Sequence, residues 1–397
     1  MIQILNIVLF IVALIIIIPG FIFSLECIAA LFSGQTQARK TNLINRPKTT
    51  ILVPAHNEAA QIRPVLETAL KQLTERDRLV VIADNCNDDT AAISKETGAT
   101  VIERFNREQR GKGYALDYGL RYIHADPPEV LVILDADCLI EPDTIEPITK
   151  LAHTIGKPVQ ATYLMEQPDC PRLQDLISMF AIKLKNLVRL RGSKRLGWHC
   201  LLTGSGMAFP WSVISQVSLA GSKTTDDMQL TVDLAIAGYT PVYCQQAQVI
   251  GRLMNDKNAQ SQRMRWEHGH LEMILVEVPR LLKKFVRQRR FDLLILAFDI
   301  LIPPLSLLIM IWLVTTAITW SVVAIGASYL PAVIVTLEGF LLFLSISISW
   351  WKFGRSYLSL CNLIAIPVYI LNKIPIYLKF IVQPQSRWLR TERDISR

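Results

Sequence analysis

Long apolar runs lie near both ends of the chain, and a mixed pattern fills its middle. Residues 4–32 carry one charge, Glu26, over a stretch long enough to cross about 30 Å of hydrocarbon as a helix. Residues 293–331 and 331–351 carry one acidic residue each. The pattern predicts an N-terminal membrane helix, whose apolar run is too long for a signal peptide, and two crossings near the other end.

Residues 357–382 are also apolar, but polar residues and prolines interrupt them. These interruptions are Asn362, Pro367, Asn372, Lys373, Pro375 and Lys379. A broken apolar stretch is typical of an interfacial or re-entrant segment, so we expect this one not to cross the membrane. Asp299 is expected near the lipid headgroups, where burying a carboxylate costs less than at the midplane.

Basic residues cluster beside the apolar stretches. The clusters are Arg39, Lys40 and Arg46; residues 283–290; Lys352 and Arg355; and Arg387, Arg390, Arg393 and Arg397. Because cytoplasmic loops are enriched in Lys and Arg, we expect all of these clusters on the cytosolic side of an inner (plasma) membrane. The expected order is an anchor (1–33), a cytosolic domain (48–270), a basic amphipathic interfacial segment (271–291), two membrane helices (292–352) and an interfacial segment with a basic tail (355–397).

Between about residues 48 and 290, short β-branched runs alternate with helical stretches. The expected strands are 50–53, 79–83, 99–102, 130–134, 158–162 and 241–250, and the expected helices are 58–73, 90–97, 112–124 and 227–237. Such alternation predicts an α/β fold, a sheet of βαβ units covered on both faces. Ligands of open α/β sheets bind beyond the carboxyl ends of the strands, so polar residues at those ends are the candidates for chemistry.

Composition narrows the function classes. The apolar share of 51% is high for a purely soluble enzyme, and 42 Lys and Arg against 34 acidic residues give a net charge of +8. This surplus gathers beside the membrane segments, and no helix-turn-helix or aromatic RNA motif occurs, so we expect no nucleic-acid partner. Seven scattered cysteines without a CxxC pair favour reduced thiols and disfavour a zinc site.

Two carboxylates follow a strongly apolar expected strand. Asp135 and Asp137 come directly after Val-Leu-Val-Ile-Leu, where oxygen ligands suit a hard divalent cation such as Mg²⁺. A turn after a strand is the structural alternative, because Asp is common there.

Two further loops resemble parts of a nucleotide site. Asp84 opens an acidic loop after another expected strand, and its carboxylate offers acceptors to a nucleobase edge. Asp89 and Thr90 in that loop look like a helix cap and first turn. Residues 110–113, Arg-Gly-Lys-Gly, include Lys112 and precede a helix, where a pyrophosphate could dock, although a basic surface turn explains them equally well.

Two motifs lie further along the chain. Thr225-Asp226-Asp227 opens an expected helix, whose dipole keeps a carboxylate ionised and ready to accept a proton, although capping explains one of the two acids. Gln262-x-x-Arg265-Trp266 offers a guanidinium for a leaving diphosphate and an indole for a sugar ring. A basic helix that faces the membrane is the alternative for the second motif.

Taken in order along the chain, these motifs resemble a membrane-integrated family 2 glycosyltransferase with the GT-A nucleotide-sugar fold, the group of the cellulose, chitin and hyaluronan synthases. The matching residues are Pro54 with Asn57 and Glu58, Asp84, Lys112, Asp135 with Asp137, Thr225 to Asp227, and Gln262, Arg265 and Trp266. The match extends from about residue 48 to residue 266. The flanking membrane helices fit the same architecture.

The resemblance implies a role for each matching residue. Pro54, Glu58, Asp84 and Lys112 would line the nucleotide pocket of a UDP-sugar, with Asp84 on the uracil. Asp135 and Asp137 would hold the diphosphate through Mg²⁺ or Mn²⁺. Asp227 would be the general base, and Gln262, Arg265 and Trp266 would close over donor and acceptor. The sequence has Asp226 where the family motif has Glu, which leaves the base assigned between Asp226 and Asp227.

The implied reaction is inverting transfer of a sugar from a UDP-sugar to a polysaccharide chain. Few expected crossings disfavour a self-contained export channel, so such a synthase would need a homo-oligomer or a secretion partner. Transfer of one sugar to a membrane lipid is the alternative. An inactive nucleotide-sugar-binding scaffold is the alternative of another class, and the presence of every metal-site Asp argues against it.

Overall fold

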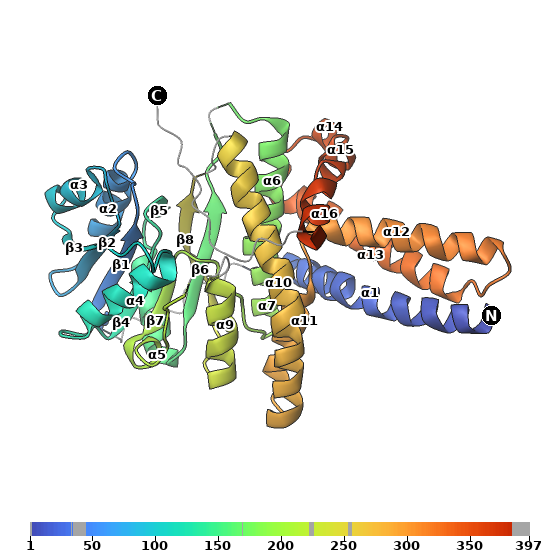
Figure 1. Ribbon diagram of the computed structural model, residues 1–397, viewed down its shortest axis with the longest axis horizontal. Coiled ribbons are helices and arrows are strands. Elements are labelled where there is room, and N and C mark those ends of the chain that lie inside the picture. The colour runs from blue at the N-terminus through green and yellow to red at the C-terminus, as the bar shows by residue number, and fades with distance from the viewer. Residues whose placement is uncertain are drawn as a thin grey trace. The chain divides into compact units, whose positions relative to one another are not determined.

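The computed structural model describes residues 2–32, 34, 45–168, 170–221, 226–252 and 256–382 (Figure 1). The chain divides into two compact units. The helical unit comprises Met1–Gly34, Pro171–Trp198 and His270–Pro384, and the sheet unit comprises Gln35–Cys170, His199–Gly269 and Gln385–Arg397. The stretch expected to be one domain, residues 48–270, is therefore interrupted by residues 171–198, which pack with the helices.

The sheet unit contains eight hydrogen-bonded strands in the order β3-β2-β1-β4-β7-β6-β8-β5. Their bounds are β1 Thr49–Ala55, β2 Arg78–Asp84, β3 Thr100–Arg104, β4 Val130–Ile133, β5 Cys138–Ile140, β6 Val159–Met165, β7 Met207–Pro210 and β8 Val242–Gly251. Strands β3, β2, β1 and β4 are parallel, and β7 pairs antiparallel with both β4 and β6. The sheet is therefore mixed, and its parallel half brings the carboxyl ends of β1, β2 and β4 to one edge.

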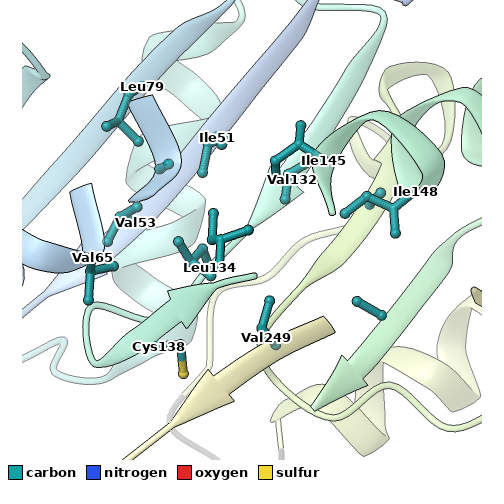
Figure 2. Packing of buried hydrophobic residues seen from close by; sticks show 14 of the residues in the cluster. Ile51, Val53, Val65, Leu79, Val132, Leu134, Cys138, Ile145, Ile148 and Val249 are labelled. Atoms are coloured by element: carbon teal, nitrogen blue, oxygen red, sulfur yellow. The ribbon is translucent and has the colours of Figure 1, made fainter. Parts of the chain in front are cut away.

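Helices cover both faces of this sheet. They are α2 Ile62–Leu70, α3 Thr90–Glu96, α4 Lys112–Ile123, α5 Ile145–Ile155, α8 Trp211–Ile214 and α9 Asp226–Ala237. Alternate residues of β1 enter different cores: Ile51 and Val53 pack in the cluster of Figure 2, whereas Leu52 packs with Leu116 of α4. This two-sided burial explains why the central strands are apolar without alternation.

All six strands expected from the sequence are present, but β5 and β7 were not expected. Each is only three or four residues long, and so short a run carries little periodicity. Helix α5 and the helices of residues 173–195 were also missed. The expected helix 58–73 is shorter, since α2 runs from Ile62 to Leu70.

The helical unit contains the apolar ends of the chain. Its helices are α1 Ile2–Leu31, α6 Leu173–Lys183, the π-helix η1 Leu184–Arg189, α7 Leu190–Arg195, α11 Phe291–Leu301, α12 Leu305–Ala324, α13 Leu330–Phe353, α14 Leu360–Leu363, α15 Ile366–Leu371 and α16 Ile374–Val382. By length and composition, Asn6–Leu31, Leu305–Ala324, Leu330–Phe353 and Leu360–Val382 could each cross a membrane. The protein is thus membrane-associated. The last of these stretches consists of three short helices, and its expected interfacial position stays a prediction.

Two expected boundaries differ from the structure. The apolar run that begins at residue 293 is divided, because α11 ends at Leu301 and α12 begins after Pro303 and Pro304, whose rings cannot continue a helix. The basic segment 271–291 does not form a separate element. Most of it is the second half of α10, a single helix from Asp256 to Gln288 that belongs to both units.

Three charged residues are buried together in the helical unit. The Arg189 guanidinium of η1 donates to Glu26 Oε2 of α1 at 2.6 Å and also to Asp299 Oδ1 of α11. Ser193 Oγ donates to the second oxygen, Glu26 Oε1, at 2.8 Å. Asp299 is buried within the protein, where Arg189 compensates its charge. Its expected level near the headgroups stays a prediction.

Candidate active site

Hydrogen bonds join the loops that follow β1 and β2. His56 Nδ1 lies 2.6 Å from the Asp84 carbonyl oxygen, the Glu58 N–H donates to Thr90 Oγ1 at 2.8 Å, and the Asn87 N–H donates to Asn57 Oδ1 at 2.9 Å. Glu58 is buried in this junction, whereas Pro54 is half-buried at the end of β1. The two loops therefore form one rigid wall at the carboxyl edge of the sheet.

Two asparagines turn the backbone in this wall. Asn57 and Asn85 have φ values of 54° and 52°, in the left-handed region that Asn adopts more readily than most residues. The Asn85 amide oxygen also accepts the Asn106 N–H at 2.8 Å, which fixes the loop after β3. These asparagines hold the wall in its shape.

Asp89 is the N-cap of α3 and Thr90 begins the helix, as expected, but the Asp89 side chain makes no cap hydrogen bond. Asp88 does so instead: its carboxylate accepts from the Thr90 N–H at 3.1 Å, from Thr90 Oγ1 at 2.5 Å and from the Ala59 N–H at 3.1 Å. Partial burial alone would raise the pKa of Asp88, but these hydrogen bonds outweigh it and lower the pKa.

Asp84 is buried at the end of β2 and is held by a cation that the sequence did not reveal. Arg104 Nη1 donates to Asp84 Oδ1 at 2.6 Å, and both side chains are buried. Asn85 Nδ2 donates to the same oxygen at 3.0 Å, while Arg104 Nη2 donates to the Gln109 carbonyl at 2.8 Å. Oδ1 is thus occupied. Within the described residues, Oδ2 is the carboxylate oxygen of Asp84 that has no hydrogen-bond donor from the protein.

Asp135 and Asp137 come together beyond β4, as expected. One oxygen of each carboxylate and the sulfur of Cys138 all lie within 4.8 Å of one another. Burial, followed by the charges of Asp137 and Asp135, raises the pKa of the Cys138 thiol, so this sulfur stays protonated. Two carboxylates beside a neutral thiol are a hard, oxygen-based donor set, which fits Mg²⁺ or Mn²⁺ rather than zinc.

Lys112 lies in the same place. It is the first residue of α4, and its ammonium donates to Asp135 Oδ1 and, at 2.6 Å, to the Gly204 carbonyl. Burial would lower the pKa of this ammonium, but the charge and hydrogen bond of Asp135 and the charge of Asp227 outweigh burial and raise it. Lys112 is therefore a permanent cation beside the carboxylates, and Arg110 and Gly111 serve as the turn that leads to it.

Three groups that are distant in the sequence surround Gly204. A Cβ added at Gly204 would lie 3.6 Å from Asp227 Oδ2, 3.8 Å from Asp135 Oδ2 and 3.8 Å from Lys112 Nζ. The residue also has a φ of 93°, which favours glycine. Glycine thus leaves open a small space bounded by two carboxylates and one ammonium.

The helix that carries Asp227 is anchored to this turn. Thr231 Oγ1 accepts the Leu202 N–H at 3.0 Å and donates to the Asp227 carbonyl at 3.0 Å. Helix α9 begins at Asp226, so Asp227 stands in its first turn, where the helix dipole favours an anion. Thr225 and the side chain of Asp226 lie outside the described residues.

The last expected motif lies on α10. Gln262, Arg265 and Trp266 are three and four residues apart, so they share one face of this helix, and all three side chains are half-buried. Their closure over donor and acceptor stays a prediction.

The sequence did not predict the residues whose hydrogen bonds hold the turn at residues 203–205 and the backbone of Asp135 in place. Gln160 is fully buried on β6; its Nε2 donates to the Ser205 carbonyl at 2.9 Å and its Oε1 accepts the Thr203 N–H at 2.9 Å. Ser205 Oγ in turn accepts the Asp135 N–H at 3.1 Å. A glutamine within an apolar strand was the available signal, since a buried amide must be hydrogen-bonded. Arg104 and Thr231 gave no comparable signal.

A family comparison matches the stretch that contains these residues. The model of a family described as "Glycosyltransferase like family 2" matches residues 47–269, more than half of the chain. The chain belongs to this glycosyltransferase family. The family stretch contains β1 to β8 and every proposed site residue. Segments of the helical unit flank it or, in residues 171–198, interrupt it.

Individual relatives of this family 2 chain match it less completely. A probable glucomannan 4-beta-mannosyltransferase of Arabidopsis thaliana is 24% identical over 58% of the chain and 45% of its own length. The 4,4'-diaponeurosporenoate glycosyltransferase of Staphylococcus aureus is 33% identical over 20% of the chain and 21% of its own length. The chain thus spans less than half the length of these curated relatives.

A solved structure shows the fold of the family 2 chain. The mannosyltransferase PcManGT of Pyrobaculum calidifontis, determined in complex with GDP-Man and Mn²⁺, superposes with a TM-score of 0.53 and 17% sequence identity. The superposition covers 94% of this chain and all of that one. It confirms the expected GT-A architecture, a mixed α/β sheet accompanied by apolar helices.

Proposed function

We propose that this chain is a membrane-bound inverting glycosyltransferase that moves a sugar from a UDP-sugar to a polysaccharide chain. The convergence of Asp135, Asp227 and Lys112 on the open space at Gly204 carries the proposal. A proton acceptor, an anion-binding cation and a metal-binding carboxylate are the groups that displacement of a nucleoside diphosphate requires.

Each residue has one task in the proposed reaction. The acceptor hydroxyl oxygen forms a bond to the anomeric carbon while the bond from that carbon to the diphosphate oxygen breaks, and the electron pair leaves with UDP. Asp227 Oδ2 accepts the hydroxyl proton, and Asp226 stays the alternative base. Lys112 offers its ammonium to the diphosphate. Arg265 would offer its guanidinium to the same group. Mg²⁺ or Mn²⁺ held by Asp135 and Asp137 would supply further positive charge for the departing diphosphate.

The hydrogen bonds of Asp84 favour uracil as the base. Its Oδ1 is occupied by Arg104 and Asn85, which leaves Oδ2 for one donor of the nucleobase. The uracil edge offers a single N–H between two carbonyls, whereas guanine presents two adjacent donors and calls for both oxygens of a carboxylate. Pro54, Glu58 and Lys112 would complete the donor pocket.

The polysaccharide acceptor is supported by the glucomannan 4-beta-mannosyltransferase among the curated relatives. A homo-oligomer or a secretion partner would then supply the export path that the four candidate spans among the described residues would not provide by themselves. The second candidate is a single transfer to a membrane lipid, and the staphylococcal relative, whose name gives one small molecule as the acceptor, favours it. We place the protein in the inner (plasma) membrane with the sheet unit in the cytosol, because the basic clusters flank the spans.

Release of nucleoside diphosphate by the purified full-length chain tests the proposal. The donors would be a panel of UDP-sugars and GDP-mannose, each with Mg²⁺, Mn²⁺ or a chelator. We expect one UDP-sugar to give metal-dependent release that Asp137→Ala and Asp227→Asn each abolish. Asp117→Asn, which removes a half-buried carboxylate of α4 that pairs with Arg121 outside the proposed site, is the matched control and should retain the activity.

The outcomes separate the candidates. Activity that persists in Asp227→Asn would move the base to another residue, and activity with GDP-mannose alone would refute the uracil assignment. A long polymer in a membrane assay supports the synthase, while a single lipid-linked sugar supports the second candidate. UDP binding without turnover of any donor or acceptor would instead support an inactive nucleotide-sugar-binding scaffold.

A further inference from the structure

Cys138 of β5 lies where the apolar core of the sheet unit meets the two proposed metal ligands. It belongs to the apolar cluster of Figure 2 and is not exposed to solvent. Its sulfur nevertheless lies within 4.8 Å of a carboxylate oxygen of both Asp135 and Asp137. A thiol in this position either binds the metal ion as a third ligand or holds the two carboxylates in place.

Hydrogen bonds occupy the thiol. It donates to Asp137 Oδ1, with 3.3 Å from Sγ to the oxygen. The Ser205 hydroxyl donates to the Cys138 sulfur, and so does the Tyr163 hydroxyl of β6. A thiol has one hydrogen to donate, and its sulfur is a weak acceptor. With the hydrogen directed at Asp137 and two hydroxyls directed at the sulfur, Cys138 keeps no lone pair for a metal ion.

The same network reaches Asp135. Ser205 Oγ accepts the Asp135 N–H at 3.1 Å, and the Cys138 N–H donates to the Asp135 carbonyl oxygen at 3.1 Å. The position of Ser205 is fixed in turn, because its carbonyl oxygen accepts from Gln160 Nε2 at 2.9 Å. Cys138 is therefore hydrogen-bonded to the backbone of one proposed ligand and to the side chain of the other.

A glycine makes room for the tyrosine of this network. Gly251, the last residue of β8, is the register partner of Cys138 in β5 and of Met165 in β6. A Cβ at Gly251 would lie 2.6 Å from the Tyr163 hydroxyl oxygen and 2.8 Å from its Cε2. Glycine at this position thus leaves the space through which the phenol reaches the Cys138 sulfur.

We propose that Cys138, supported by Tyr163 and Ser205, is a positioning residue that orients Asp135 and Asp137 for a divalent cation and does not bind the cation itself. The proposal rests on the proposed function, in which these two carboxylates hold Mg²⁺ or Mn²⁺. Groups that hydrogen-bond to metal ligands fix the orientation of those ligands, and removing such a group typically lowers metal affinity about 10- to 100-fold.

Binding of Mn²⁺ to the detergent-purified full-length chain tests the proposal. Free Mn²⁺ would be measured by electron paramagnetic resonance in the presence of UDP. We expect Cys138→Ala to weaken binding about 10-fold or more, and Cys138→Ser, whose hydroxyl can also donate to Asp137, to restore most of the affinity. Tyr163→Phe should weaken binding less than Cys138→Ala does, because the thiol keeps its own hydrogen bond to Asp137.

Cys244→Ala is the matched control for the loss of a buried thiol. Cys244 belongs to the same apolar cluster and is also buried, but it lies near the start of β8, whereas Gly251 ends that strand. This variant should bind Mn²⁺ as the unaltered chain does. An equal loss of affinity in Cys138→Ala and Cys244→Ala would show that core packing supports the site, and would overturn the proposal.

Co²⁺ distinguishes a positioning thiol from a ligating one. Thiolate bound to Co²⁺ gives a charge-transfer absorption that oxygen ligands do not give. We expect the absorption on addition of Co²⁺ to be the same in the unaltered chain and in Cys138→Ser, since the other cysteines are common to both. A band that is lost in Cys138→Ser would identify the sulfur as a ligand and refute the positioning role.

Asp137→Ala separates this proposal from the proposed function. Absence of Mn²⁺ binding by the unaltered chain, or binding that Asp137→Ala does not weaken, would refute the proposed metal site and the role of Cys138 with it. Binding that depends on Asp137 but is unchanged in Cys138→Ala would refute the positioning role alone.

Discussion

Arg104 Nη1 and Asp84 Oδ1 are 2.6 Å apart, and both side chains are buried at the edge of the sheet where the nucleotide site is proposed. The pair ties the end of β2 to the end of β3, since Asp84 and Arg104 are also register partners in the two parallel strands. The carboxylate that would read the nucleobase is therefore fixed in orientation before any ligand binds.

Removal of the arginine should leave a buried, uncompensated carboxylate. We expect Arg104→Met to lower the free energy of unfolding by about 3–5 kcal/mol, the usual cost of breaking a buried ion pair. Arg104→Met combined with Asp84→Asn should regain part of this stability but not UDP binding, as measured by denaturant titration and calorimetry. Equal stabilities of the single and double variants would show that the two charges are not coupled.

The start of α4 depends on a glycine. A Cβ at Gly113 would lie 2.4 Å from the Leu219 carbonyl oxygen and 2.8 Å from that of Gly221. Because these are backbone atoms, Gly113→Ala should displace Lys112 or residues 219–221, cost about 1–3 kcal/mol of stability and reduce UDP release. Gly221→Ala is the control, since its Cβ meets nothing nearer than 4.0 Å. Similar effects of both substitutions would contradict this explanation.

Thr231 should matter through Asp227 rather than through the donor. Thr231→Val removes the acceptor of the Leu202 N–H, and an unsatisfied buried donor costs about 1–3 kcal/mol. We expect a lower kcat with little change in the KM for the donor, because the first turn of α9 loses its anchor while the nucleotide pocket is untouched. Thr231→Ser keeps the hydroxyl and should keep kcat; a loss of activity in Thr231→Ser equal to that of Thr231→Val would point to packing instead.

The contribution of Asp88 should depend on pH. Its folded-state pKa is lowered, so its stabilisation is complete above the unfolded value of about 3.9 and is lost as the pH falls through the folded pKa. Asp88→Ala should therefore destabilise the chain by about 1 kcal/mol at neutral pH, with a smaller difference in acid. Asp89→Ala, at an exposed acid without a cap hydrogen bond, should change little; unfolding titrations at several pH values distinguish the two.

The buried charges of the helical unit should be interdependent. Arg189→Met would leave Glu26 and Asp299 without compensation and should lower stability by about 3–5 kcal/mol. Adding Glu26→Gln and Asp299→Asn to that variant should recover much of the loss, because none of the three charges of this cluster then remains buried. Arg195→Met, at the exposed end of α7, is the control, and thermal unfolding in detergent is the measurement. Failure of the triple variant to recover stability would show that these three side chains stabilise the helical unit by their packing and not by their charges.

The sequence by itself determined the kind of fold and the place of the site. Uninterrupted apolar runs such as residues 79–83 and 130–134 identify central strands because the sheet is buried on both faces, and the polar residues after them mark its carboxyl edge. Asp84, Asp135 and Asp137 could thus be found from local pattern alone. The long apolar runs identified the membrane-associated ends for the same reason, since helix length and polarity are local properties.

Only the tertiary structure decided which groups meet. Arg104 is twenty residues from Asp84 in the sequence, Lys112 is ninety-two from Gly204 and Glu26 is 163 from Arg189, and no local periodicity reports such pairings. Only the structure shows that residues 171–198 group with the helical unit and not with the sheet unit, and that β7 lies between β4 and β6. These pairings follow from strand order and from the compensation of buried charge, which are properties of the whole packed chain. Hydrophobic patterning, in contrast, reports only on a single helix or strand.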